Sequence, residues 1–559
     1  YINMAIEKAE EPSTPIHKQR SEHAALQKWG RVAAVVVLIL IYSALALIYS
    51  NDYLDDPWIA YRYARNLARG DGLVWNVGER PVEGYTCFLW VIMNSLFIRL
   101  DIFPLLGSKI VSLFSGIVMI VAVFSPLNKT VTSFIPRLTL ALLISLCPVL
   151  LFYGQSGMET LFFTAFVFLG TIVWSSSREQ VNRNSFLFLA SVMYGFAFLT
   201  RPEGLLLFTI VLVFEVVYIG RRIKEGDSWR QYRSELVAFC TPFLIIGLSY
   251  FVWRLAYYGF LFPNTYYAKH SGNRLNNLPL GLLYIGQAFS SYLVVPFALL
   301  AGLLVRSSIA GRWRRVILPL ATIPAVYAAY IMWMGGDDTA AFPSARLLAP
   351  VIPIIYLVLV IALEEALKSA THGKQIMVSS IAVALCILSW TSDGLALLKR
   401  SNPELTSSVR PSAFMSFVAR KIDRLNQDKA DELSVWIRQQ TRPDDLIAVP
   451  WAGRVPYYTD RPVLDMLGLN DLHIAHVEPQ QRGIDVKMDP AYVLARKPKL
   501  IFVNVGSTYW RGDASFEEAG GWKLGDKLLL DMLRESSEYV FVEDAPTTIS
   551  VFRRVTSEN

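Results

Sequence analysis

Two adjacent aspartates, Asp55 and Asp56, follow the first long apolar block and open the densest polar cluster in the chain. Unpaired carboxylates do not help a helix cross a membrane, so the pair indicates a functional site. Pro57 can begin a helix that Asp56 caps, and such a helix brings Arg62 and Arg65 onto neighbouring turns. Carboxylates beside arginines suit a general base flanked by anion-binding groups. The alternative interpretation is an N-cap with ordinary surface ion pairs.

More charged residues interrupt or border later apolar blocks, where an unpaired charge is costly. Arg201, Lys269 and Arg346 could together bind a phosphate, and His270 follows Lys269 directly. The alternative for each cation alone is a side chain that reaches the membrane interface or an internal ion pair. The same polar stretches hold acidic candidates for contact with a polar substrate, namely Glu83, Glu159, Glu203 and Asp337.

Composition indicates which elements must position these residues. Of 559 residues, 53% are hydrophobic and 18% are charged, and the mean hydropathy of +0.37 exceeds that of ordinary globular chains. Apolar blocks of roughly 17–24 residues match helices that cross a bilayer core of about 30 Å. We predict eleven membrane-spanning helices, at 32–50, 107–126, 136–152, 158–176, 186–200, 203–220, 235–258, 280–305, 315–334, 345–364 and 375–392.

Basic residues in the short loops set the orientation of these helices, because such loops stay in the cytoplasm. Residues 1–31 are predicted to be a cytoplasmic N-terminal arm, and residues 32–392 a transmembrane domain. Within that domain, residues 51–106 are predicted to form a large outer loop. The apolar stretch 85–98, at about fourteen residues, is too short to span and is predicted to be an interfacial or re-entrant helix. The alternative is a twelfth span there, with a paired error elsewhere.

The last part of the chain has a different pattern. Short apolar runs bounded by turn signals alternate with polar helical segments, 411–440 and 526–536 among them, which predicts a soluble α/β domain over 393–559. The parity of the spans puts this domain outside, on the side of the aspartate pair. The runs are Leu446–Val449, Val463–Leu467, Leu500–Val505, Tyr539–Val542 and Ile549–Phe552.

Missing motifs exclude several classes of protein. The sequence has no G-x-x-x-x-G-K-[ST] motif, so a nucleotide-driven pump is not indicated. It has no H-E-x-x-H motif and no Cys/His cluster typical of a zinc site. The net charge of +7 lies in the loops between apolar blocks, which argues for membrane orientation and against a nucleic-acid partner.

Longer stretches around these residues resemble the GT-C superfamily of integral-membrane glycosyltransferases. L-D-D-P-W-I-A-Y-R-Y-A-R-N-L-A-R-G-D-G-L-V-W-N and V-E-G-Y-T-C-F-L-W are similar to a branch that includes the arabinofuranosyltransferases of mycobacterial and corynebacterial cell-wall polysaccharide. The resemblance runs from about residue 32 to 480, through S-G-M-E-T, T-R-P-E-G, G-G-D-D, R-L-L-A-P, V-P-Y-Y and P-V-L-D-M-L-G-L-N-D.

The resemblance implies a polyprenyl-phosphate sugar donor, here decaprenylphosphoryl-arabinofuranose, with no further cofactor. We predict no metal, because a monophosphate donor has no pair of phosphates for a metal to bridge. It implies inverting transfer to a cell-envelope polysaccharide or glycoprotein at the outer face of a bacterial inner membrane. Asp55 or Asp56 would be the catalytic base; we favour Asp55, with Asp56 as a helix cap or acceptor-orienting group. The leaving phosphate would be bound by Arg201, Arg346 and Lys269.

Four aromatic residues of the outer loop could stack on sugar rings or anchor the loop at the interface: Trp58, Tyr61, Trp75 and Tyr85. The sequence leaves the sugar and the acceptor open. One alternative is a transferase that modifies pilin or lipopolysaccharide with another polyprenyl-linked sugar. A second is a transporter of lipid-linked sugars, although no internal repeat typical of transporters is visible.

Overall fold

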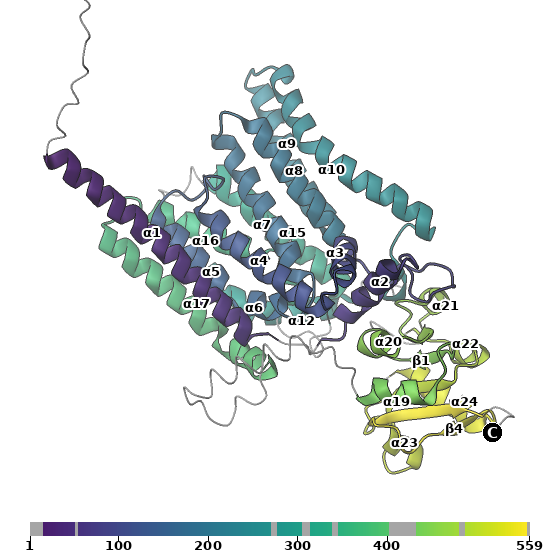
Figure 1. The fold of residues 1–559 in the computed structure, drawn as a ribbon. Helices are drawn as coiled ribbons and strands as arrows, with labels where there is room; N and C mark the ends of the chain where they lie inside the picture. Colours follow the sequence, from purple (N-terminus) through teal and green to yellow (C-terminus); the bar gives the residue numbers. More distant parts are fainter. Residues whose placement is uncertain are drawn as a thin grey trace, which may run out of the picture.

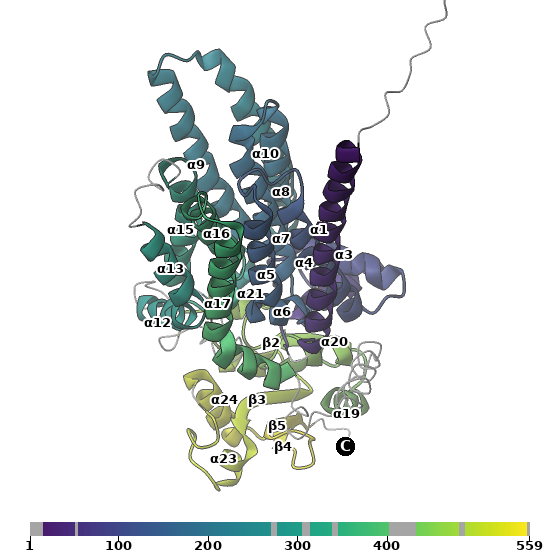
Figure 2. The same cartoon turned by 90° about the vertical axis from the view of Figure 1, so that its left-hand side faces the viewer.

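The protein is described here from a computed structural model, which covers residues 15–50, 54–269, 277–304, 313–337, 345–401, 432–479, 487–521 and 523–555. Figure 1 shows a bundle of helices with a smaller domain, which contains a sheet, at one end. The N-terminal end of α1 points away from this domain, and Figure 2 shows the same arrangement from a second direction.

Long apolar helices form the bundle. Among the described residues, eight helices are long and apolar enough to cross a bilayer, and the pair α5–α6, bent by 53°, makes nine if it is counted as one broken span. The chain is therefore a multi-pass membrane protein. The helices of the bundle are α1 (Pro15–Ile48), α4 (Pro104–Phe124), α5 (Phe134–Leu146), α6 (Pro148–Gly154), α7 (Thr160–Ser176), α8 (Arg183–Thr200), α9 (Glu203–Lys224), α10 (Trp229–Tyr258), α12 (Leu278–Ala288), α13 (Val294–Leu304), α15 (Leu318–Met334), α16 (Ile352–Ala366) and α17 (His372–Ser401).

Eleven spans were expected, and the difference comes from two of the predicted blocks. Block 186–200 forms α8, whose 18 residues include the polar start Arg183-Asn184-Ser185 and are not among the helices counted as spans by length and composition. Block 345–364 forms α16, which has only 15 residues. At 1.5 Å per residue such a helix is about 22 Å long, shorter than a bilayer core of about 30 Å.

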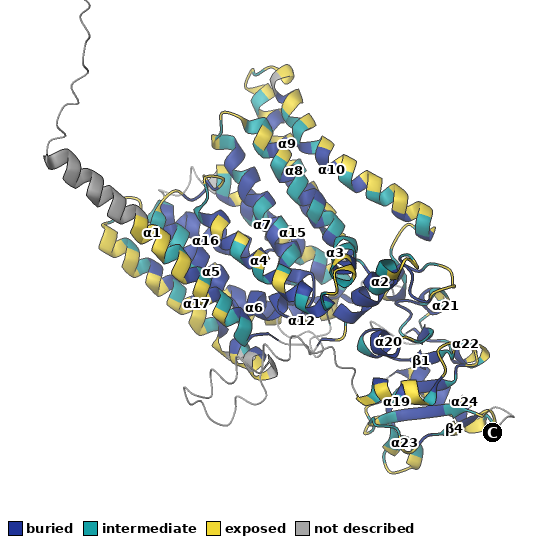
Figure 3. Ribbon diagram, in the orientation of Figure 1, coloured by how far each residue is buried: buried dark blue, intermediate teal, exposed yellow. Residues whose placement is uncertain are grey.

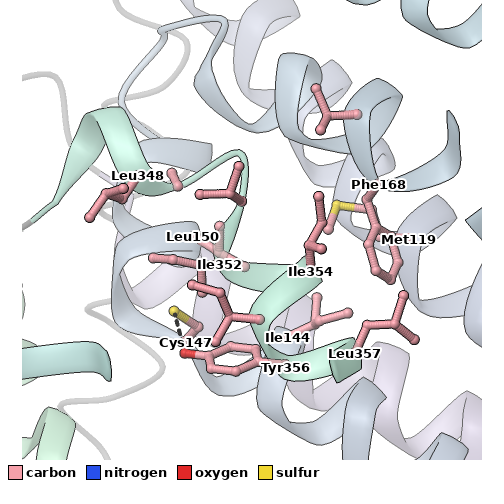
Figure 4. Packing of buried hydrophobic residues seen from close by; sticks show 14 of the residues in the cluster. Met119, Ile144, Cys147, Leu150, Phe168, Leu348, Ile352, Ile354, Tyr356 and Leu357 are labelled. Carbon is pink, nitrogen blue, oxygen red and sulfur yellow. Dashed lines mark hydrogen bonds between the residues drawn. The ribbon is translucent and has the colours of Figure 1, made fainter. Parts of the chain in front are cut away.

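Helix α16 lies at the centre of the bundle, and its sequence is apolar because protein surrounds it. Every residue from Ile352 to Leu363 is buried, whereas α10 and α17 expose apolar side chains outward (Figure 3). A helix that is hydrophobic all round is typical of such a position. Figure 4 shows Tyr356 and its neighbours packed among residues of α4, α5, α6 and α7, with the Tyr356 hydroxyl 3.6 Å from Cys147 Sγ.

Two short helices occupy the outer loop. Helix α2 (Pro57–Arg69) packs against α3 (Phe88–Arg99), and α3 also contacts α4 and α8. The apolar stretch 85–98 thus corresponds to α3, a helix of 12 residues. This length is about 18 Å, so α3 does not cross the bilayer alone.

The C-terminal domain contains a five-stranded sheet in the order β2-β1-β3-β5-β4. β1 pairs in parallel with β2 and β3, and β5 pairs antiparallel with β3 and β4. The five predicted apolar runs correspond to the five strands. The elements are α19 (Glu432–Gln440), β1 (Ile447–Val449), α20 (Arg454–Thr459), β2 (Val463–Asp465), α21 (Leu472–His476), α22 (Pro490–Ala495), β3 (Leu500–Gly506), α23 (Ser507–Arg511), α24 (Leu524–Glu535), β4 (Tyr539–Phe541) and β5 (Ile549–Arg554).

The segment around Glu83 joins the outer loop to α10 and to the C-terminal domain. Arg254 of α10 donates from Nε to both Glu83 oxygens, at 2.9 and 2.7 Å, and both side chains are buried. The Asn264 amide donates to the Glu83 carbonyl at 2.9 Å, and its side chain donates to the carbonyls of Gly468 and Leu469. Glu83 therefore holds a junction of three chain segments, and this explains its place in the sequence better than contact with a sugar does.

Replacing Glu83 with glutamine is expected to lower the unfolding temperature in detergent. The change leaves a buried guanidinium without its carboxylate, and breaking such a pair costs about 3–5 kcal/mol. Glu225→Gln is the matched control, because its partner Arg222 is exposed and surface pairs contribute little. Equal unfolding temperatures for Glu83→Gln and Glu225→Gln would contradict the assignment of Glu83 as a structural ion pair.

Candidate active site

Asp56 lies at the N-cap position of α2 but does not act as a cap. Pro57 occupies the first turn, as predicted, yet the Asp56 side chain makes no cap hydrogen bond. Its Oδ2 instead lies 3.4 Å from Nη1 of Arg346. The prediction that Asp56 caps α2 is therefore wrong. Its carboxylate pairs with Arg346, from a distant segment, instead of the first amides of the helix.

Asp55 faces the C-terminal domain. Its Oδ2 accepts from the backbone amide of Gly453 at 2.9 Å, and its Oδ1 accepts from the amide of Arg454 at 2.7 Å. The residue reaches solvent on one side, but the protein packed closely around the carboxyl group has the larger effect. This burial, together with the charge of Asp56, outweighs the two amides and raises the pKa of Asp55 to about 6. A carboxylate with such a pKa suits a general base.

Arg346 is buried in a short 3-10 turn, η6 (Arg346–Leu348), that leads into α16. Its Nε lies 2.7 Å from Asp337 Oδ2, a short contact, whereas the contacts of Nη1 are longer. Nη1 is 3.4 Å from Asp56 and 3.5 Å from the Met158 sulfur. The turn that leads into α16 thus places a buried guanidinium between the carboxylates of Asp337 and Asp56.

Arg201 lies at the corner between α8 and α9, where Pro202 interrupts the apolar run. Its Nη1 is 2.5 Å from Glu159 Oε1, and its Nη2 is 3.1 Å from Glu203 Oε1. Proline cannot continue the hydrogen-bond ladder of α8, so the chain turns here and an arginine comes to the end of the bundle. The two glutamates orient this arginine.

A narrow cavity joins the two arginines. Two guanidinium groups and four carboxylates, those of Asp56, Glu159, Glu203 and Asp337, therefore lie at or beside this cavity. In the part of the chain that the structure describes, no three His, Cys, Asp or Glu residues are grouped closely enough to hold a metal ion. The cavity is lined by Thr160, Phe163, Arg201, Tyr327, Arg346, Leu347 and Pro350.

Several predicted binding residues lie elsewhere. Lys269 is exposed at the end of α11 (Asn264–Lys269), and His270 lies outside the described residues. Arg62 and Arg65 are largely buried and bind backbone carbonyls of the segment around α20, which makes them links between domains. They therefore do not have the open guanidinium groups that an anion site requires.

The four aromatic rings expected to stack on sugars or to anchor the outer loop are all covered by protein. Trp58 packs against Tyr457 and Tyr458, and Tyr61 donates to the Gly157 carbonyl at 2.9 Å. Trp75 donates to the carbonyl of Val463 at 3.3 Å, and the Tyr85 hydroxyl lies 3.0 Å from that of Tyr258. These contacts are with the protein itself and involve neither a sugar nor the membrane interface.

Gly453 and Arg454 are the site residues that sequence reasoning missed. They stand just before V-P-Y-Y, a stretch noted only for its resemblance to other proteins. No local pattern indicates that their amides meet a carboxylate 398 positions earlier in the chain. Thr160 and Tyr327 of the cavity were missed as well, because they read as ordinary helix residues.

Two comparisons of the sequence with known proteins give partial matches. Residues 420–552 match a family described as a domain of unknown function, DUF8728. The chain is 27% identical over 262 residues to the terminal beta-(1->2)-arabinofuranosyltransferase of Mycobacterium tuberculosis, covering 44% of this chain and 39% of that relative. The match thus spans about two fifths of the relative's length.

Two solved structures align with nearly the whole chain. ArnT from Cupriavidus metallidurans, bound to undecaprenyl phosphate, aligns with a TM-score of 0.55 and 14% identity, over 94% of this chain and 98% of ArnT. The apo oligosaccharyltransferase of Archaeoglobus fulgidus aligns with a TM-score of 0.53 and 13% identity, over 95% and 75% of the two chains. The chain therefore has the GT-C fold and resembles a GT-C glycosyltransferase of the arabinofuranosyltransferase branch.

Proposed function

We propose that the protein is an inverting glycosyltransferase that moves a sugar, D-arabinofuranose, from a polyprenyl-phosphate donor to a cell-envelope glycan. One observation carries the proposal. Asp55 and Asp56 are neighbours in sequence, but they face a backbone cradle and a buried arginine respectively. A carboxylate with a raised pKa therefore lies one residue from a carboxylate that meets a phosphate-binding candidate.

The assignment of the base follows from the geometry of inversion. The acceptor oxygen attacks the anomeric carbon from the face opposite the leaving phosphate, so base and phosphate site must be separated. Asp56 touches Arg346 and thus belongs to the phosphate side. Asp55 is turned toward Gly453 and is the better candidate for the base. Asp56 then orients Arg346.

In the proposed reaction the acceptor hydroxyl gives its proton to Asp55 as its oxygen bonds to the anomeric carbon. The bond between that carbon and the phosphate oxygen breaks, and the electron pair leaves with the polyprenyl phosphate. Arg201 and Arg346 stabilise the charge that develops on this phosphate. The undecaprenyl phosphate bound in the ArnT structure supports a donor of this lipid class.

The proposed setting is the bacterial inner membrane, with the N-terminus in the cytoplasm and the C-terminal domain outside. It rests on the basic residues of the short loops. It also rests on the arrangement in which the N-terminal end of α1 and the C-terminal domain lie at opposite ends of the bundle (Figure 1). Lys269 has no assigned role in this proposal.

A transfer assay tests the function. The purified protein in nanodiscs is incubated with radiolabelled decaprenylphosphoryl-arabinofuranose as donor and a synthetic arabinofuranose oligosaccharide as acceptor. We expect labelled product and free decaprenyl phosphate, with equal rates with and without EDTA, because no pyrophosphate needs bridging by a metal. Product with another polyprenyl-linked sugar, or with a pilin or lipopolysaccharide acceptor, would revise the substrate. Movement of the donor across the membrane of sealed proteoliposomes without product would replace the transferase by a transporter.

The rate should depend on pH through Asp55. A protonated carboxyl group cannot accept the hydroxyl proton, so kcat/KM is expected to fall as the pH drops through about 6. Below that value the fall should approach about tenfold per pH unit, as for loss of one essential base. Initial rates between pH 5 and 8 measure this limb, and a flat profile over that range would argue against Asp55 as the base.

A further inference from the structure

Helix α20 of the C-terminal domain lies along α2 and is bound near both ends. Arg62 donates to the carbonyl of Pro456, in the middle of α20, at 2.5 Å and to that of Arg461, just after it, at 2.8 Å. Arg65 donates to the Tyr457 carbonyl at 2.6 Å and pairs with Asp460 at 2.7 Å. At its start, two backbone amides bind Asp55. These contacts place the beginning of α20 beside the aspartate pair.

The backbone at Gly453 approaches Asp55 too closely for any side chain. A Cβ at this position would lie 2.0 Å from the Asp55 carbonyl oxygen and 2.4 Å from the Asp55 carboxyl carbon. Distances below 3.0 Å require a shift of one of the two segments. The absence of a side chain is thus what permits the amides of Gly453 and Arg454 to reach the carboxylate.

We propose that Gly453 and the Arg454 amide are positioning residues for the catalytic base, so that the C-terminal domain completes the active site. The inference rests on the proposed function, because it takes Asp55 as the base. Each carboxylate oxygen accepts one amide, which fixes the plane of the carboxylate. One lone pair of each oxygen is left for the proton of the acceptor.

The indole of Trp58 stabilises this arrangement. It packs against Tyr457 and Tyr458, with ring centroids 5.0 and 4.8 Å apart, and the Arg454 guanidinium lies 5.5 Å from its centroid. Trp58 lies three positions after Asp55 and is 1% exposed. The segment that carries the base therefore cannot move independently of α20.

Gly453→Ala tests the inference. We expect kcat to fall about 100-fold, because a displacement near 1 Å can have that effect, while KM for the donor changes little. The two amides favour the charged form of Asp55, so their loss should also move the acidic limb to higher pH. A merely structural glycine would not move this limb. Gly220→Ala is the control, since a Cβ there meets nothing within 4 Å.

Arg454→Pro is the second variant. Proline is tolerated at the first position of a helix but removes the amide donor to Asp55. Arg454→Lys keeps the amide and the charge and serves as its control. Docking of the domain is followed by cross-linking Glu79→Cys to Arg496→Cys with a short bis-maleimide, because these side chains form a 2.7 Å ion pair.

Loss of rate with intact cross-linking in Gly453→Ala or Arg454→Pro, but not in Arg454→Lys, supports the inference. If Gly453→Ala fails to cross-link, the domain no longer docks in that variant, and the rate of Arg454→Pro is then the test of the inference. An active wild type whose Gly453→Ala and Arg454→Pro variants keep the wild-type kcat and acidic limb would overturn the inference alone, as would equal losses in Arg454→Pro and Arg454→Lys. A wild type without product would instead overturn the proposed function.

Discussion

Replacing Asp55 with asparagine is expected to reduce kcat by about 10²–10⁴, the range that a positioned general base contributes. Asparagine can accept one of the two amides of Gly453 and Arg454 through its carbonyl oxygen and loses the other hydrogen bond, a change that the fold should survive. It cannot take the acceptor proton. Single-turnover transfer of labelled arabinofuranose measures the chemical step, and the residual rate should no longer fall near pH 6.

Asp56→Asn is the matched comparison. Asp56 contacts Arg346 at 3.4 Å and is partly exposed, so its loss should weaken donor binding more than it lowers kcat. A larger drop in kcat for Asp56→Asn than for Asp55→Asn would transfer the role of base to Asp56. Full activity in both single variants and in the double variant would remove the carboxylate pair from the mechanism.

Replacing Arg346 with methionine is expected to lower kcat/KM about 10²–10³-fold, as removal of one group that stabilises a developing negative charge does. Methionine fills similar space and carries no charge. Arg346→Lys should recover part of the loss, because lysine supplies the charge without the planar fork that binds two phosphate oxygens. Rates at saturating and limiting donor separate the effects on kcat and KM.

The Arg346→Met change also leaves the buried Asp337 carboxylate without its partner at 2.7 Å. The double variant Arg346→Met with Asp337→Asn removes this unpaired charge and is the proper control for folding. If the double variant regained wild-type kcat/KM, the loss in the single variant would reflect the unpaired Asp337, and Arg346 would have no role in catalysis. Lys368→Met, on an exposed side chain in another loop, should have no effect.

The fold could be predicted where burial from solvent produces a recognisable pattern of apolar and polar residues. The five strands are short apolar runs between turn residues, and all five form. The count of spans differed because hydropathy measures exclusion from water and does not distinguish lipid from protein. Helix α16 is as apolar as a spanning helix, yet its main neighbours are the helices α5, α13 and α15. Its 15 residues fall below the usual length of a span, although Arg346 before it contacts Asp56 and Glu364 near its end binds Thr132 in the loop after α4.

The site could be predicted where burial of charge is costly and not where long-range partners decide. Arg201 and Arg346 stand out because each interrupts or borders an apolar run, and both line one cavity. The rings of Trp58 and Trp75 look the same in sequence whether they meet a sugar or a protein backbone. Their partners, such as Val463, lie hundreds of residues away. Only the packing of the C-terminal domain settles that choice.

The contacts between α20 and the segment of Asp55 and α2 also bear on when, during synthesis, the protein becomes active. Asp55 is synthesised early, whereas Gly453 follows it by 398 positions and belongs to a domain that folds after the bundle has been made. The proposed donor site, with Arg201 and Arg346, lies in the part of the chain that is synthesised before that domain. An incomplete chain would thus bind the lipid-linked sugar without an oriented base, which would spare the donor from hydrolysis during biosynthesis.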